Sequence, residues 1–135
     1  MFSRILRLIW WSSLLAGVLS HPAVLAGAEG EVANLSAKVF AQRASEAGVV
    51  ILDVRTEREL KSGRIEKAVH LDISAPDFEA RLQQLDRKAV YLVYCASGVR
   101  STRACQKMKA LGFEHVFNLD RGLLAWRAAG LPVVK

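Results

Sequence analysis

The fold is decided by residues 89–101, which read AVYLVYCASGVRS. The part from Ala89 to Tyr94 predicts a strand, and Cys95 follows it directly. A short loop with Gly98 comes next, and we expect a helix to begin near Ser101, because apolar residues recur from there at helical spacing. The order of strand, short loop and helix predicts one unit of a parallel sheet.

The same alternation of strands and helices extends outward in both directions. An unbroken apolar run from Val49 to Leu52 predicts a parallel strand that is covered on both faces. Ser36 is a good N-cap for a helix before it, and Ser74 for one after it, where Asp77 completes a capping-box-like pair. The other expected elements are a helical turn at 57–60, strands at 68–71 and 116–117, and a helix at 123–128.

This alternation predicts an α/β fold, a single domain whose central parallel sheet carries helices on both faces. The 135 residues leave room for one such domain. Ligands of these folds bind outside the carboxyl ends of the strands, which is where Cys95 stands.

The N-terminus has the pattern of a secretory signal peptide. Arg4 and Arg7 precede an apolar run from Leu8 to Leu19, and small residues follow. Cleavage fits after Ala26 or Ala28, with Ala28 the better pattern, so we expect a signal peptide at 1–28 and the domain at 29–135. The apolar run of about 12 residues is short of the roughly 20 that span a bilayer. We therefore expect a periplasmic or secreted protein without stable membrane insertion after cleavage.

Charge and cysteine content limit the kinds of ligand and partner that the chain can be expected to bind. The formal charge of +6 falls to +4 without Arg4 and Arg7, and the other charges alternate in sign, so no nucleic-acid partner is expected. Two cysteines are too few for a four-thiolate metal site, and the three histidines form no ligand cluster. We expect a small anionic substrate and no metal site. The oligomeric state stays open.

The loop after Cys95 suits a thiolate nucleophile. A helix N-terminus, loop N–H groups and the cation of Arg100 lower the pKa of a thiol and stabilise a bound anion. Gly98 permits a positive φ that turns successive amides inward. Hydroxyl groups of Ser97 and Ser101 add donors. Cys95 and Arg100 are thus the candidate catalytic residues, and the candidate substrate-binding residues are Ala96, Ser97, Gly98, Val99 and Ser101.

Residues 95–101 resemble the active loop of the rhodaneses, Cys-x-x-Gly-x-Arg-Ser/Thr. Residues 52–65, LDVRTERELKSGRI, resemble a second rhodanese segment, Asp-Val-Arg…Glu…Gly-His-Ile-Pro-Gly-Ala. Residues 118–133, NLDRGLLAWRAAGLPV, resemble the closing motif, Gly-Gly…Ala-Trp…Gly-Leu-Pro-Val. The resemblance covers essentially all of the expected mature chain, which is identified as an exported member of the single-domain rhodanese (thiosulfate sulfurtransferase) family.

The resemblance implies sulfur transfer through a persulfide on Cys95. The donor would be thiosulfate or a similar anion, the acceptor cyanide or a thiol, and neither metal nor cofactor takes part. The loop amides and Arg100 would hold the persulfide and the departing sulfite. The chain departs from the family at Arg64 (His), Glu66-Lys67 (Pro-Gly) and Arg121 (Gly), which leaves the donor preference open.

Three residues are candidates for the rim of the pocket: Asp53, Arg55 and Arg64. For the first two, the favoured interpretation is structural, with Asp53 accepting from loop amides and Arg55 pairing at the surface. Cys105 could in principle form a disulfide with Cys95, but a position about a turn along the helix disfavours it.

Two other functions remain as alternatives. A cysteine phosphatase or arsenate reductase of related fold uses a Cys-x5-Arg loop, whereas four residues separate Cys95 from Arg100 here. The shorter loop favours sulfur transfer. A sulfur-carrier or binding module with little turnover would use the same fold.

Overall fold

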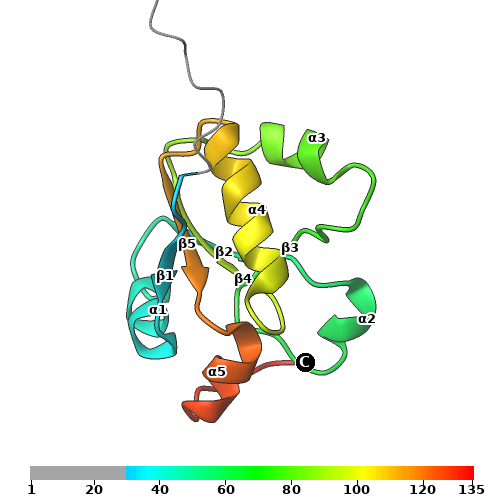
Figure 1. Ribbon diagram of the computed structural model, residues 1–135. Coiled ribbons are helices and arrows are strands. Elements are labelled where there is room, and N and C mark those ends of the chain that lie inside the picture. The colour runs from blue at the N-terminus through cyan, green and yellow to red at the C-terminus, as the bar shows by residue number, and fades with distance from the viewer. Residues whose placement is uncertain (1–29) are drawn as a thin grey trace, which may run out of the picture.

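A computed structural model describes residues 30–135, so the predicted signal peptide and its cleavage sites lie outside the described residues. Five strands and five helices alternate in this part of the chain (Figure 1). The strands are β1 (Ala33–Leu35), β2 (Val49–Asp53), β3 (Val69–His70), β4 (Val90–Tyr94) and β5 (His115–Leu119). The helices are α1 (Ala37–Ala44), α2 (Glu57–Leu60), α3 (Phe78–Gln83), α4 (Val99–Ala110) and α5 (Gly122–Ala128).

The strands form a single parallel sheet in the order β1-β5-β4-β2-β3. β4 lies at its centre, paired with β2 on one side and with β5 on the other. All carboxyl ends therefore meet at one edge, and the chain that leaves β4 enters the middle of that edge. In Figure 1, α4 crosses in front of the sheet, and α2 stands at the side of this edge.

Side-chain alternation along β4 builds a core on each face of the sheet. Tyr91 and Val93 join the cluster formed with α3 and α4, whereas Leu92 and Tyr94 join the cluster formed with α1 and α5. Successive strand residues point to opposite faces, so a strand that is apolar throughout requires helices on both. The predicted α/β fold with a doubly covered parallel sheet is confirmed.

Several local predictions were wrong in detail. β1 was not predicted, because it has only three residues and two of them are exposed. Ser74 does not cap α3: its hydroxyl donates to Asp72, and the helix begins later, after an Asp77 that makes no side-chain capping bond. α4 begins at Val99, two residues before the expected start, so the loop that follows Cys95 is shorter than predicted.

Two of the departures from the family pattern stand in a backbone conformation that favours glycine. Lys67 has φ of 64° and Arg121 has φ of 55°, and these are the only non-glycine residues of 30–135 with positive φ. A side chain there costs roughly 1–2 kcal/mol relative to glycine. The fold tolerates this strain at both positions.

Within residues 30–135, no helix is both long and apolar enough to cross a membrane. The same range holds no cluster of three or more His, Cys, Asp or Glu side chains suited to a metal ion.

Candidate active site

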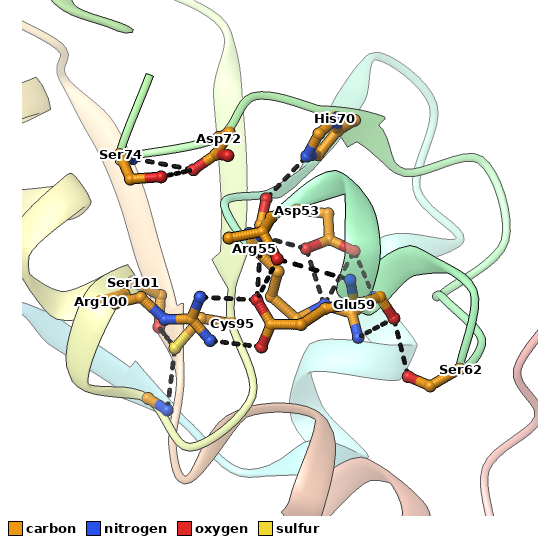
Figure 2. Close-up of polar contacts among 12 residues, drawn as sticks. Asp53, Arg55, Glu59, Ser62, His70, Asp72, Ser74, Cys95, Arg100 and Ser101 are labelled. Atoms are coloured by element: carbon orange, nitrogen blue, oxygen red, sulfur yellow. Dashed lines mark hydrogen bonds and ion pairs between the residues drawn. The ribbon is translucent and has the colours of Figure 1, made fainter. Parts of the chain in front are cut away.

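Cys95 lies at the carboxyl end of the central strand and is fully buried. Its Sγ accepts hydrogen bonds from the backbone N–H of Gly98 at 3.1 Å and from the hydroxyl of Ser101 at 3.3 Å (Figure 2). Both donors lie at the start of α4. The Gly98 N–H is available there because the first backbone N–H groups of a helix have no acceptor within the helix. The sulfur therefore occupies a position that is built for a negative charge.

The pKa of Cys95 reflects a competition between burial and hydrogen bonding. Burial is the largest single effect and raises the pKa, but the hydroxyl of Ser101 and the amides of Ser101, Ser97 and Gly98 together outweigh it. The result is a pKa below the ordinary value of a thiol. At Cys105, burial outweighs the groups that lower the pKa and raises it to about 12. The two cysteines thus differ strongly in thiolate character, which is the form that reacts.

We expect the ultraviolet absorbance of the thiolates to rise in two well-separated steps as the pH increases. Cys95 ionises first, below the range of an ordinary thiol, and Cys105 ionises near pH 12. Ser101→Ala removes a donor that favours the thiolate, so it shifts the first step to higher pH and leaves the second in place. A single combined step in the native protein would contradict this assignment.

The N-terminus of α5 holds the Cys95 loop from the other side. The N–H of Leu123 donates to the carbonyl of Cys95 at 2.8 Å, and the N–H of Leu124 donates to the carbonyl of Ala96 at 3.1 Å. Gly122 makes this approach possible, because a Cβ there would lie 2.5 Å from the Cys95 carbonyl oxygen. The closing segment of the chain therefore shapes the backbone next to the nucleophile.

Gly122→Ala is expected to lower stability by more than the strain of a positive φ alone. The added methyl would overlap the backbone of Cys95 and Ala96, and such overpacking costs typically about 1–3 kcal/mol. Gly48→Ala is the matched control, since Gly48 also has positive φ but no atom within 4 Å of its Cβ position. Denaturant unfolding of both variants measures the difference. Equal losses would show that α5 does not press on the loop.

Arg100 is held beside the loop by Glu59 of α2. Its two terminal nitrogens donate to the two carboxylate oxygens, each at 2.7 Å (Figure 2). This bidentate pair raises the pKa of Arg100 and lowers that of Glu59 to about 2, because each charge stabilises the other. Within residues 30–135 the Arg100 guanidinium makes no other hydrogen bond, so its remaining N–H groups can donate to an anion. The carboxylate of Glu59 also partly neutralises the positive charge of Arg100.

The sequence analysis did not predict a role for Glu59 at the site, although a local motif at this residue can be seen in the sequence. Thr56 and Glu59 form a capping box: the N–H of Glu59 donates to the Thr56 hydroxyl, and the carboxylate of Glu59 accepts from the Thr56 N–H. The Thr-x-x-Glu spacing is the signature of this motif. What the sequence does not show is that the same carboxylate reaches Arg100, 41 positions away.

Asp53 and Arg55 form a buried ion pair in contact with α2. They are 0% and 2% exposed, and the Asp53 carboxylate also accepts from the Tyr94 hydroxyl at 2.6 Å. Arg55 donates in addition to the Gly63 carbonyl at 2.9 Å. The expectation that Arg55 pairs at the surface was wrong, because these acceptors satisfy its guanidinium inside the protein. The pair supports the segment that carries Glu59.

Of the other predicted site residues, some contact the Cys95 sulfur and others do not. The amide of Ser97 stabilises the thiolate, whereas the carbonyl of Ala96 turns toward α5 and the side chain of Val99 is exposed. Arg64 is half-buried, and its backbone pairs with Val134 through two hydrogen bonds of 2.8 Å. Cys105 is a free, buried thiol that packs with Ala104 and Met108, so the expected packing is confirmed.

A cavity of about 230 Å³ opens beside the loop, between α2 and α5. It is smaller than the roughly 300–1,000 Å³ that is usual for drug-sized ligands, so it suits a small ion. Its lining comes from both helices, from residues on either side of α2, and from the residue after the nucleophile: Arg55, Glu59, Ser62, Ala96, Leu123, Leu124 and Arg127.

Comparisons with known proteins identify the family of the chain. Residues 36–129 match the family model for the rhodanese-like domain. The chain is 31% identical over 104 residues to a sulfurtransferase of Allochromatium vinosum, an alignment that covers 76% of this chain and 95% of the relative.

Solved structures show the same likeness. A rhodanese-related protein from Thermoplasma volcanium is similar with a TM-score of 0.68 at 28% identity, over 76% of this chain and 97% of the other. A thiosulfate sulfurtransferase from Pseudomonas aeruginosa is similar with a TM-score of 0.65 at 28% identity, over 78% of this chain and 20% of the other.

Proposed function

The chain belongs to the rhodanese-like family, and from this premise we propose that Cys95 carries sulfane sulfur from thiosulfate or a similar anion to a thiophilic acceptor. Sulfur transfer as a class of reaction follows from the family and from its relatives named sulfurtransferase. The donor, the acceptor and the persulfide are our proposal.

The observation that carries the proposal is the environment of the Cys95 sulfur. Three backbone amides and one hydroxyl favour its thiolate, and the negative charge of the thiolate stabilises the charged guanidinium of Arg100. These are the features that a thiol needs in order to attack sulfur at neutral pH and to retain a negatively charged product. The small cavity at Ala96 leaves room for a donor of the size of thiosulfate.

The reaction takes two displacement steps. The Cys95 thiolate attacks the outer sulfur of thiosulfate, a sulfur–sulfur bond forms, and sulfite leaves with the electron pair of the bond that breaks. Cys95 then carries a persulfide, whose negative terminal sulfur is stabilised by the amides and by Arg100. Cyanide or a thiolate attacks that terminal sulfur, takes it as thiocyanate or as a new persulfide, and regenerates the Cys95 thiolate. Protons and electrons balance without a cofactor.

Incubation of the protein with thiosulfate and cyanide tests the proposal, with thiocyanate as the measured product. We expect multiple turnovers per protein molecule and no release of phosphate from an aryl phosphate in a parallel assay. Phosphate release without thiocyanate would favour the phosphatase alternative instead. Loading of Cys95 without turnover would favour a sulfur carrier.

We also propose that the protein is exported and cleaved after Ala28, with Ala26 as the second site. The support is the basic, apolar and small-residue order of residues 1–28. Expression in a bacterial host followed by N-terminal sequencing of the periplasmic fraction should give a chain that begins at Glu29 or Gly27. A chain that still begins at Met1 and needs detergent for extraction would support a membrane anchor.

A further inference from the structure

The cavity beside the Cys95 loop contains a charged residue to which the family resemblance gives no role. This residue is Arg127, in the last turn of α5, and it lines the cavity together with Ala96, the residue after the nucleophile. Leu123 belongs to the same lining, and its N–H donates to the Cys95 carbonyl at 2.8 Å. Arg127 therefore shares a small cavity with the backbone of the nucleophile loop.

The side chain of Arg127 reaches from α5 to the segment that follows α2. Arg127 lies on the same face of α5 as Leu123 and Leu124, because residues three and four apart are neighbours on a helix surface. Its Nη2 donates to the Ser62 carbonyl at 2.5 Å. Gly63 leaves room for this contact, since a Cβ there would lie 3.2 Å from the same nitrogen. The guanidinium makes no other hydrogen bond within residues 30–135, so its remaining N–H groups can donate to an anion.

Two other arginines at this site are compensated by carboxylates of the protein (Figure 2). Arg55 also lines the cavity, but its guanidinium is buried and paired with Asp53 at 2.6 Å. Arg100 donates both terminal nitrogens to Glu59, which itself lines the cavity. Glu59 and, more weakly, Asp72 stabilise the charged form of Arg100 and raise its pKa. These two arginines therefore contribute little net positive charge to the cavity.

Arg127 carries the positive charge that remains uncompensated. It is exposed and makes no ion pair within residues 30–135. A cavity of about 230 Å³ keeps a bound anion within the Debye length of about 8 Å from its lining, so solvent ions screen the attraction only in part. The charge of Arg127 therefore favours the entry of anions over neutral molecules.

From this arrangement we infer that Arg127 determines the preference of the site for anionic sulfur donors. The inference rests on the proposed function, in which the donor is thiosulfate or a similar anion. Arg127 attracts the negatively charged end of the donor and binds it through its free N–H groups. Arg100 and the loop amides, in contrast, stabilise negative charge at the Cys95 sulfur. A donor without negative charge gains nothing from Arg127.

The kinetic test uses thiosulfate as the donor and cyanide as the acceptor. Arg127→Gln removes the charge and should raise the KM for thiosulfate about tenfold with kcat nearly unchanged, because the lost interaction serves binding. Arg127→Lys keeps the charge and should retain most of the affinity. Lys88→Gln is the matched control, since it removes one charge from an exposed position before β4, at the opposite edge of the sheet from Cys95. It should leave the KM unaltered.

A second measurement reports the attraction of anions to Cys95 without any sulfur transfer. Iodoacetate and iodoacetamide alkylate the same thiolate with loss of iodide, but only iodoacetate is negatively charged. Cys105 does not interfere, because burial raises its pKa to about 12. We expect the ratio of the iodoacetate rate to the iodoacetamide rate to fall about threefold in Arg127→Gln, as for one partly screened charge. The ratio should stay near the wild-type value in Arg127→Lys and in Lys88→Gln.

The two measurements separate this inference from the proposed function. An unchanged alkylation ratio in Arg127→Gln, or an equal loss of thiosulfate affinity in Lys88→Gln, would overturn the role of Arg127. A KM that rises equally in Arg127→Lys and Arg127→Gln would also contradict it, since the charge would then not be the cause. If thiosulfate loads no sulfur onto the wild type while the alkylation ratio still falls in Arg127→Gln, the proposed function alone fails.

Discussion

Cys95→Ser is expected to abolish sulfur loading and to lower thiosulfate turnover by about 10⁴-fold or more, as the loss of a covalent nucleophile does in other enzymes. A hydroxyl at this position has a far higher pKa than a thiol, so the donors at Gly98 and Ser101 cannot ionise it at neutral pH. Intact-mass spectrometry after thiosulfate treatment measures the loading directly. The wild type should gain one sulfur atom, which cyanide then removes.

Cys105→Ser is the matched control for this prediction. Its thiol is buried in the core with α4, and burial raises its pKa to about 12, so it stays protonated and unreactive. The variant should still gain one sulfur atom and turn over, with some loss of stability because a hydroxyl replaces a buried thiol. If Cys105→Ser abolished loading while Cys95→Ser did not, the nucleophile would be Cys105.

The second large effect is expected for Arg100→Ala, which should reduce kcat/KM for thiosulfate by roughly 10²–10³-fold with an unchanged circular dichroism spectrum. Arg100 is the cation next to the thiolate, and its removal leaves the charge of Glu59 unpaired beside the site. That carboxylate has a pKa of about 2 when paired with Arg100. The exposed anion then repels a dianionic donor. Arg100→Lys should recover part of the activity, because it restores charge without the bidentate geometry.

The double variant Arg100→Ala/Glu59→Gln separates these two contributions. Neutralising Glu59 removes the repulsion, so the double variant should bind thiosulfate better than Arg100→Ala but remain well below the wild type. Non-additivity is expected because the two side chains are in direct contact. If Arg100→Ala keeps full turnover with a native spectrum, the loop amides suffice and the role given to Arg100 is wrong.

The sequence determined the features that depend on short stretches of chain. The apolar run of β2, the strand before Cys95 and the helix after it are encoded locally, so the doubly covered parallel sheet could be predicted. The position of Cys95 at a strand end and the donors at Gly98 and Ser101 follow from residues 89–101. The short edge strand β1 and the start of α3 could not be predicted, since exposed or weakly capped segments leave little pattern.

Tertiary structure alone decided the contacts between segments that are far apart in the chain. Only the packing of α2 against the Cys95 loop brings Glu59 to Arg100, and only the position of α5 requires that Gly122 carry no side chain. Arg55 can be buried because its guanidinium pairs with Asp53 and donates to the Gly63 carbonyl. The side-chain NH₂ group of Asn118 likewise donates to Thr102 and Asn34, which come from two other elements. Hydrogen-bond partners of buried groups are chosen by the packing of whole elements, and a local pattern does not contain that information.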